Sequence, residues 1–211
     1  MKNRGVQDIC ASLFFAGSLD SGESLEMEKE MEKIMEMEDS IIMATENDRE
    51  EILALYKAQI GRDFCPWTEE YPGNDTISFD LSRDSLFVMK REGRVAAAVS
   101  IDDDPDVNNL PCWNLDLAPG GELSRLCVLP ELQNEGIARK MMLFGMEELA
   151  KRGFKSIHFL VNKYNVKAIQ SHAALGCAVV GECHMYEQDF LCYEKALRGN
   201  LKRDHDLFSA L

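Results

Sequence analysis

A glycine-containing loop between a predicted strand and a predicted helix has the clearest capacity for chemistry in this sequence. The strand ends at Leu126-Cys127-Val128, Pro130 follows, and the loop reads Gln133-Asn-Glu-Gly-Ile-Ala138. Gly136 has no side chain and Ala138 only a small one, so several backbone N–H groups stay unpaired at the positive end of the helix that begins here. Such a helix start stabilises a phosphate or a pyrophosphate. Taken alone, the pattern also fits an ordinary strand-to-helix loop.

The elements that must position this loop alternate between strand and helix. The second half of the chain predicts, in order, strand 122–128, helix 136–152, strand 156–161, helix 166–175, and strands 177–182 and 190–195. The first half predicts strand 40–45, helix 46–60 and a hairpin of strands 86–90 and 94–101, with a Gly-, Pro- and aromatic-rich break at 61–73. Two strand-helix-strand units with short links indicate an α/β domain with parallel pairing in its centre.

The charge of the chain is negative and unevenly distributed. The 211 residues include 23 Lys+Arg and 37 Asp+Glu, a formal charge of −14. Residues 1–51 hold 14 of the acids and only 5 of the bases. A surface without an excess of bases gains little from counterion release, which argues against a nucleic-acid partner. The negative field favours cationic or amine-bearing ligands.

Hydropathy and cysteine usage bear on the location of the protein. No stretch reaches the roughly 18 to 20 apolar residues that a membrane helix needs, and residues 9–19 lack the clear cleavage site of a signal peptide. The seven cysteines are scattered without C-x-x-C spacing, which favours reduced core thiols and predicts no zinc site. We therefore expect a cytoplasmic protein with no membrane partner and no metal.

The order of motifs in the second half resembles that of the GNAT superfamily of acyl-CoA-dependent N-acyltransferases, and the resemblance covers about residues 40–197. Gln133–Ala138 resembles the family's pyrophosphate-binding loop, and Asn165-x-x-Ala168 followed by Leu175-Gly176 and a strand resembles its next motif. The glycine patterns of dinucleotide folds and of nucleotide triphosphatases are both missing. The resemblance implies a single α/β domain with a mixed, twisted β-sheet of six to seven strands flanked by helices on both faces.

The resemblance also implies a site for acetyl-CoA as co-substrate. Backbone groups of Leu126 and Val128 would bind the pantetheine arm where the fourth and fifth strands separate, and the amides of residues 134–139 would hold the pyrophosphate. Arg139 or Lys140 would add a charge-assisted contact, unless both simply lie on an exposed helix face. Asn165 would bond the pantetheine, cap its helix, or do both. The implied cofactor-binding residues are Leu126, Cys127, Val128, Gln133, Asn134, Glu135, Gly136, Ile137, Ala138, Arg139 and Asn165.

Two residues are implied to be catalytic. Glu122, on the strand beside the thioester, would act as general base directly or through a water, unless it is a surface residue at a strand end. The family usually has a Tyr seven residues after the motif Asn, where this chain has His172. A cationic His172 could protonate the leaving sulfur, but its imidazole is shorter and differently aimed than a phenol, and a partly exposed helix position is the alternative. Tyr164 and Tyr186 are fallback donors.

The acceptor side is less well defined by the sequence. Trp67, Tyr71 and Trp113 could wall a pocket in which Glu69-Glu70 or Asp102–Asp106 attract an ammonium. Loop anchors for the aromatic residues and a solvated turn for the acids are the alternatives.

We expect an N-acetyltransferase that transfers an acetyl group from acetyl-CoA to a primary amine by direct attack, without a metal. The missing Tyr makes a non-catalytic acyl-CoA-binding sensor or regulatory module the alternative, and an interaction protein acting through its acidic arm is a third reading. The predicted organisation is an acidic extension, helical or disordered, at 1–39, the acetyltransferase domain at 40–197 and a tail at 198–211. The extension could also cover a partner subunit in a homodimer.

Overall fold

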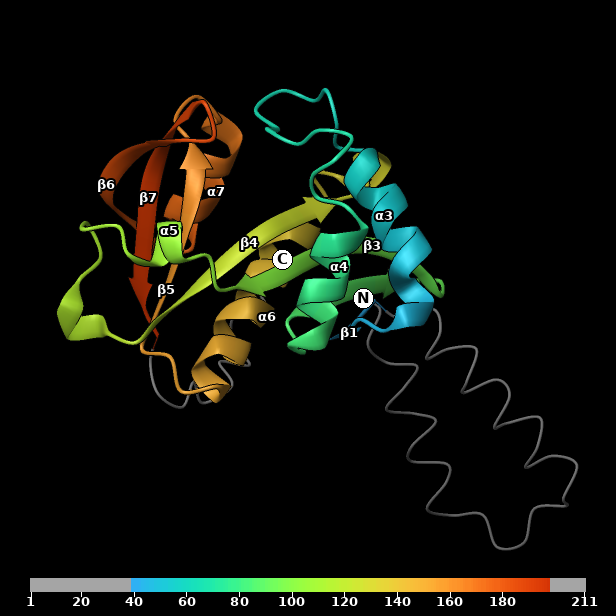
Figure 1. Ribbon diagram of the computed structural model, residues 1–211, viewed down its shortest axis with the longest axis horizontal. Helices are drawn as coiled ribbons and strands as arrows, with labels where there is room; N and C mark the ends of the chain where they lie inside the picture. Colours follow the sequence, from blue (N-terminus) through green and yellow to red (C-terminus); the bar gives the residue numbers. More distant parts are fainter. Residues whose placement is uncertain (1–38, 198–211) are drawn as a thin grey trace, which may run out of the picture. The chain divides into compact units, whose positions relative to one another are not determined.

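The computed structural model describes residues 39–197 (Figure 1). The predictions for the N-terminal extension, apart from Asp39, and for the tail at 198–211 therefore lie outside the described residues. The elements are β1 (Ser40–Met43), α3 (Arg49–Lys57), α4 (Asn74–Ser82), β2 (Leu86–Arg91), β3 (Arg94–Asp102), α5 (Pro105–Asn108), β4 (Gly120–Val128), α6 (Ile137–Lys151), β5 (Ser156–Asn162), α7 (Val166–Ala174), β6 (Ala178–Met185) and β7 (Gln188–Ala196). Short 3-10 turns lie at Glu46–Asp48, Leu115–Leu117 and Pro130–Leu132.

The strands form one seven-stranded mixed sheet, which confirms the predicted fold class. Its order is β1-β2-β3-β4-β5-β7-β6. β4 and β5 pair in parallel, and the other neighbouring strands pair antiparallel. The second strand-helix-strand unit adds no further parallel pair, because β7 lies between β5 and β6.

Helices cover both faces of the sheet. The helix α6 buries Ile137, Met141 and Leu149, spaced by four and eight residues, in a core that includes Ile157 of β5. On this face Gly145 is required by close packing, since a Cβ there would meet a methyl carbon of Leu123 at 2.5 Å. The helices α3 and α4 pack on the opposite face, in a second core formed by Ile52, Leu55, Tyr56 and Ile77 with Val88 and Ala98.

The helix α4 was not predicted from the sequence. Its buried residues are Ile77 and Asp80, so one of the two positions that face the core carries a charge. A helix with so short an apolar stripe gives almost no periodic signal.

The cysteines of the described chain are all free thiols. Cys127, Cys177 and Cys192 are buried, as expected for core thiols. None of the helices between residues 39 and 197 is long and apolar enough to cross a membrane.

Candidate active site

A deep cleft opens where β4 and β5 separate. The two strands pair only between Gly120–Glu122 and Ser156–His158, and they diverge beyond these residues (Figure 1). The cleft has a volume of about 1060 Å³ and is lined by Leu123–Val128 of β4 and Phe159–Asn162 of β5. The start of α6, the helix α7 and the segment that follows α3 complete its walls. The divergence of two parallel strands therefore creates this cleft.

An irregularity in β4 bends the strand into this cleft. Between Ser124 and Cys127, β4 has one residue more than the facing part of β3, and Arg125 has a φ of 51°. Positive φ is uncommon for a residue with a side chain, and such a bulge twists the strand. The Arg125 side chain is 5% exposed and is held by ion pairs with Asp80 and Asp102. The buried ion pairs thus stabilise the bent form of β4.

The predicted anion cradle lies at the start of α6. Gly136 caps the helix with a φ of 80°, in the left-handed region that favours glycine, and a Cβ there would have no atom within 4 Å. The first helical hydrogen bond runs from the Lys140 N–H to the Gly136 carbonyl. The amides of residues 137–139 precede it and have no partner within the helix. Open space and unpaired donors therefore coincide at the edge of the cleft, which suits a phosphate group.

The acid of the cradle loop, Glu135, is neutralised by a neighbouring base. Arg91 forms an ion pair with Glu135 at 2.6 Å and another with Asp39 at 2.8 Å. Lys140 pairs with Asp39 at 3.0 Å, so of the two predicted phosphate-binding bases only Arg139 lines the cleft. Glu135 likewise does not line the cleft.

The other predicted cofactor residues lie along the walls of the cleft. Leu126, Cys127, Val128, Gln133, Asn134, Ile137, Ala138 and Asn165 all contribute to its lining. The Val128 carbonyl already accepts hydrogen bonds from the side chains of Gln59 (3.1 Å) and Gln133 (3.4 Å). The Asn165 side chain accepts from the Ala168 N–H at 3.1 Å, which confirms its role as the α7 cap.

Glu122 is a buried carboxyl group, so the interpretation as a surface residue is wrong. It is 5% exposed, and its Oε2 has no hydrogen-bond partner among the described residues. Burial, together with the negative charges of Asp102 and Asp104, raises the pKa of Glu122 to about 8, while the nearby Arg125 guanidinium and Asp104 backbone oppose this shift. Glu122 directly precedes the β4 residues of the cleft wall and lines a separate hollow of about 240 Å³.

Comparison with known proteins identifies the family. Residues 33–177 match the model of the Acetyltransferase (GNAT) family. The chain belongs to the GNAT acetyltransferases. Members of this family acetylate with acetyl-CoA, and the anion cradle and the cleft lie within or beside the matched residues. A search of curated protein sequences found no match.

Solved structures share the fold of this GNAT acetyltransferase at low sequence identity. The ribosomal-protein-S18-alanine N-acetyltransferase from Escherichia coli is 17% identical, with a TM-score of 0.59 over 79% of this chain and 98% of that one. An N-acetyltransferase from Staphylococcus aureus is 19% identical, with a TM-score of 0.61 over 76% and 99%. A protein from Salmonella typhimurium described as an acetyltransferase, solved with its cofactor acetyl-CoA, is 18% identical, with a TM-score of 0.61 over 80% and 99%.

His172 takes the position at which the GNAT motif usually has a Tyr. It is buried rather than partly exposed, lines the cleft, and packs against the rings of Phe159 (4.7 Å) and Tyr193 (5.7 Å). Burial lowers the pKa of His172 to about 4, so the imidazole is neutral at neutral pH. The cationic form that the predicted donor role requires is therefore disfavoured. Of the fallback donors, Tyr164 is 62% exposed and lines the cleft, whereas the Tyr186 hydroxyl donates to Asp104.

The aromatic residues of the predicted acceptor side are partly loop anchors. Trp67 packs edge-on against Tyr56 at 5.3 Å and also lines the cleft. Trp113 stacks on His158 at 4.7 Å and donates its indole N–H to a backbone carbonyl. The Tyr71 hydroxyl accepts from Arg125 at 3.1 Å.

Three buried polar residues were missed from the sequence. Asp80 and Arg125 form the ion pair beneath the β4 bulge, and His158 lies beside Glu122 on β5. Arg125 carried a signal, because a charged residue interrupts an otherwise largely apolar strand next to the proposed base. Asp102, interpreted as part of a solvated turn, instead belongs to this buried ion network and accepts from Ser124 at 2.9 Å.

Proposed function

We propose that the chain is an N-acetyltransferase that transfers an acetyl group from acetyl-CoA to a primary amine by direct attack. The observation that carries this proposal is a cleft between β4 and β5 with an anion cradle at its edge; a buried, partly unpaired carboxyl lies next to the β4 residues of the cleft wall. One protein with the same fold, from Salmonella typhimurium, was solved with its cofactor acetyl-CoA.

The proposed reaction needs one proton acceptor and one proton donor. The amine nitrogen attacks the thioester carbon, the C–S bond breaks, the amine proton leaves to a base, and the CoA thiolate takes up a proton. Glu122 is the proposed base, and because it lies behind the cleft wall rather than in the lining, it would receive the amine proton through a water molecule. A pKa of about 8 makes its carboxylate a stronger base than an ordinary Glu.

The chemistry of the cleft residues supports direct attack rather than an acetylated enzyme. Cys65 and Cys127 line the cleft, and burial raises the pKa of both thiols above the ordinary value. A thiol with a raised pKa supplies little thiolate at neutral pH and is a poor nucleophile.

The proposed cofactor contacts use mainly backbone. The amides of residues 137–139 would hold the pyrophosphate with Arg139 beside them, and the backbone of Leu126 and Val128 would bind the pantetheine. The Val128 carbonyl already accepts two hydrogen bonds, so the proposed pantetheine contact of Val128 would be made by its N–H. Six free thiols in the described chain support the proposed cytoplasmic location, since disulfides are rare there.

Thiol release tests this function. The full-length chain is incubated with acetyl-CoA and a panel of primary amines, and free CoA is measured with a thiol reagent. We expect amine-dependent release that falls more than about tenfold in Glu122→Gln near neutral pH and recovers at higher pH, where the amine deprotonates by itself. CoA binding in calorimetry without release for any amine would contradict catalysis and favour the binding module.

A further inference from the structure

Three separate segments of the chain meet beside Glu122. Asp104 precedes α5, Tyr186 lies in the turn between β6 and β7, and Tyr71 lies between α3 and α4. The Tyr186 hydroxyl donates to the Asp104 carboxylate at 2.7 Å, and the Asp104 backbone lies close to the Glu122 carboxyl group. Tyr71 is tied to the same region through Arg125. The loop Asp102–Asp104 thus links the proposed base to the β6–β7 turn.

The Asp104 carboxylate has polar partners but no cation. Besides Tyr186, it accepts from the Asp106 N–H at 2.9 Å. The buried cation of this region, Arg125, is already engaged by Asp80 and Asp102. Within residues 39–197, no Lys, Arg or His forms an ion pair with Asp104, although the neighbouring Asp102 has two. The negative charge of Asp104 is therefore left without a counter-charge.

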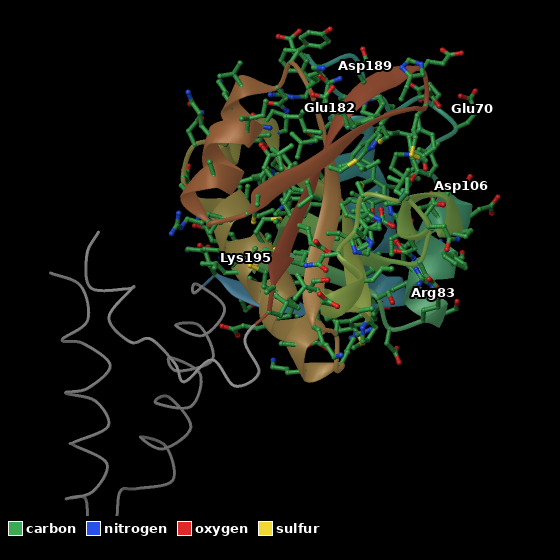
Figure 2. The ribbon with its side chains drawn as sticks, turned by 90° about the vertical axis from the view of Figure 1, so that its left-hand side faces the viewer. Glu70, Arg83, Asp106, Glu182, Asp189 and Lys195 are labelled. Carbon is green, nitrogen blue, oxygen red and sulfur yellow. The ribbon has the colours of Figure 1, made fainter. Side chains whose placement is uncertain are left out.

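Glu122 supplies an independent sign of a ligand at this place. Its carboxyl is more than nine-tenths buried, lies against the Asp104 backbone, and leaves Oε2 without a partner among the described residues. A buried polar atom without a hydrogen bond is costly, so it suits a position where a substrate or water completes it. Figure 2 shows acids over the upper part of this side of the domain, among them Asp106, Glu182 and Asp189, whereas Arg83 and Lys195 lie lower.

We propose that Asp104, positioned by Tyr186, binds a second ammonium group of the acceptor, so that the preferred acceptors are short alkyl diamines and polyamines. The proposal rests on the proposed function and names its substrate class. One ammonium would pair with Asp104 while the other nitrogen, near Glu122, is acetylated. The bound cation would also offset the negative charges of Asp102 and Asp104, which add to the effect of burial in raising the pKa of Glu122. Asp104 is then a residue that determines specificity.

Three acceptors of matched length test this specificity. Thiol release is measured with butane-1,4-diamine, 4-aminobutan-1-ol and butylamine, which differ only at the far end of the chain. We expect kcat/KM to be at least about tenfold higher for the diamine, since a charge-assisted hydrogen bond exceeds a neutral one by roughly this factor. Asp104→Asn, which keeps the backbone N–H and an acceptor for Tyr186, should remove the preference, and Asp104→Glu should restore part of it.

Asp106→Asn is the matched control, because it removes the same charge two residues away on α5 without a contact to Glu122. It should retain the diamine preference. Equal kcat/KM for the three acceptors would overturn the proposal, and so would an equal loss of preference in the Asp104 and Asp106 variants, which would indicate only a diffuse field. In either case, amine-dependent thiol release would still support the proposed function. If CoA binds but no amine leads to thiol release, the proposed function, on which this substrate class rests, is wrong.

Discussion

A carboxyl group such as that of Glu122 loses hydration when it is buried, and the loss affects stability as well as chemistry. The sequence suggested a base at this position, but the exposure of the side chain could not be predicted. The structure shows that the side chain is buried, because β3, β4 and the loop before α5 enclose Glu122 together with Asp102 and Asp104. At the residue scale, the burial and the neighbouring charges of Glu122 follow from the fold and could not be predicted from its spacing to Gly136.

The raised pKa of Glu122 predicts how stability depends on pH. Below the ordinary pKa of 4.5 the group is protonated in both the folded and the unfolded state, so it has no effect. As pH rises towards 8, the unfolded state ionises while the folded state stays protonated, so stability falls until the folded group also ionises. Glu122→Gln lacks this loss. Its melting temperature should be close to that of the parent near pH 4 and exceed it by about 10 °C or more near pH 8.5. A difference that does not change with pH would contradict the raised pKa.

The neutral state of His172 predicts a small role in protonating the leaving thiolate. His172→Phe keeps an aromatic ring against Phe159 and Tyr193, and its thiol release should stay within about threefold of the parent from pH 6 to pH 9. His172→Tyr should retain or raise turnover, because a phenol restores the usual GNAT donor. CoA affinity, measured by calorimetry, should change little in both. A loss of more than about tenfold in the Phe variant would instead show that the imidazole takes part in the acid step.

At the scale of elements, hydrophobic periodicity predicted the helices and strands that have a regular apolar face. The helix α6, with its clear apolar stripe, and the β2–β3 hairpin, with its Glu92-Gly93 turn, match the prediction. The helix α4 and the β4 bulge did not follow from periodicity, because both depend on the buried pair of Asp80 and Arg125. A charged pair that stabilises a fold from within interrupts the apolar patterns by which elements are recognised.

At the junction of β4 and α6, two substitutions of Gly136 can separate the effect of backbone strain on CoA binding from the effect of added charge. Gly136→Glu adds negative charge beside the proposed pyrophosphate, and the Kd for CoA should rise at least about 100-fold in calorimetry. Gly136→Gln is the matched control: it adds similar bulk and the same strain at a φ of 80° without charge, so it should weaken binding by about tenfold or less. Unchanged affinity in a folded Gly136→Glu variant would remove the cradle from the site.

At the scale of the whole molecule, the order of motifs predicted more than any single segment. The cradle, the α7 cap at Asn165 and the sheet were expected together, and the family match over residues 33–177 confirms the membership that their order implied. For the proposed acceptor side, the sequence suggested Tyr71 and the acids 102–106, whereas Tyr186 was considered only as a proton donor. These residues lie far apart in the sequence, so their proximity could not be predicted without the complete fold.

The boundary of the folded domain gives a prediction that involves the entire chain. Residues 1–36 are strongly acidic and contain no apolar cluster of core size. Within residues 39–197, segments from β1 onwards supply two apolar cores. A chain that starts at Met37 should melt within about 2 °C of the parent. A chain that starts at Ser40 also loses Asp39, and with it the ion pairs to Arg91 and Lys140.

The ion pairs of Asp39 are partly exposed, so their loss should cost about 1 kcal/mol, or roughly 2 to 4 °C in a domain of this size. Without Asp39, Arg91 still pairs with Glu135 and Lys140 loses its acidic partner, so the shorter chain should bind the anionic CoA at least as well as the one starting at Met37. Melting curves at matched CoA concentration, sizing chromatography and calorimetry on both chains measure these effects. A large drop in melting temperature, or the loss of an oligomer, on removal of residues 1–36 alone would show that the acidic extension packs on the domain or pairs subunits.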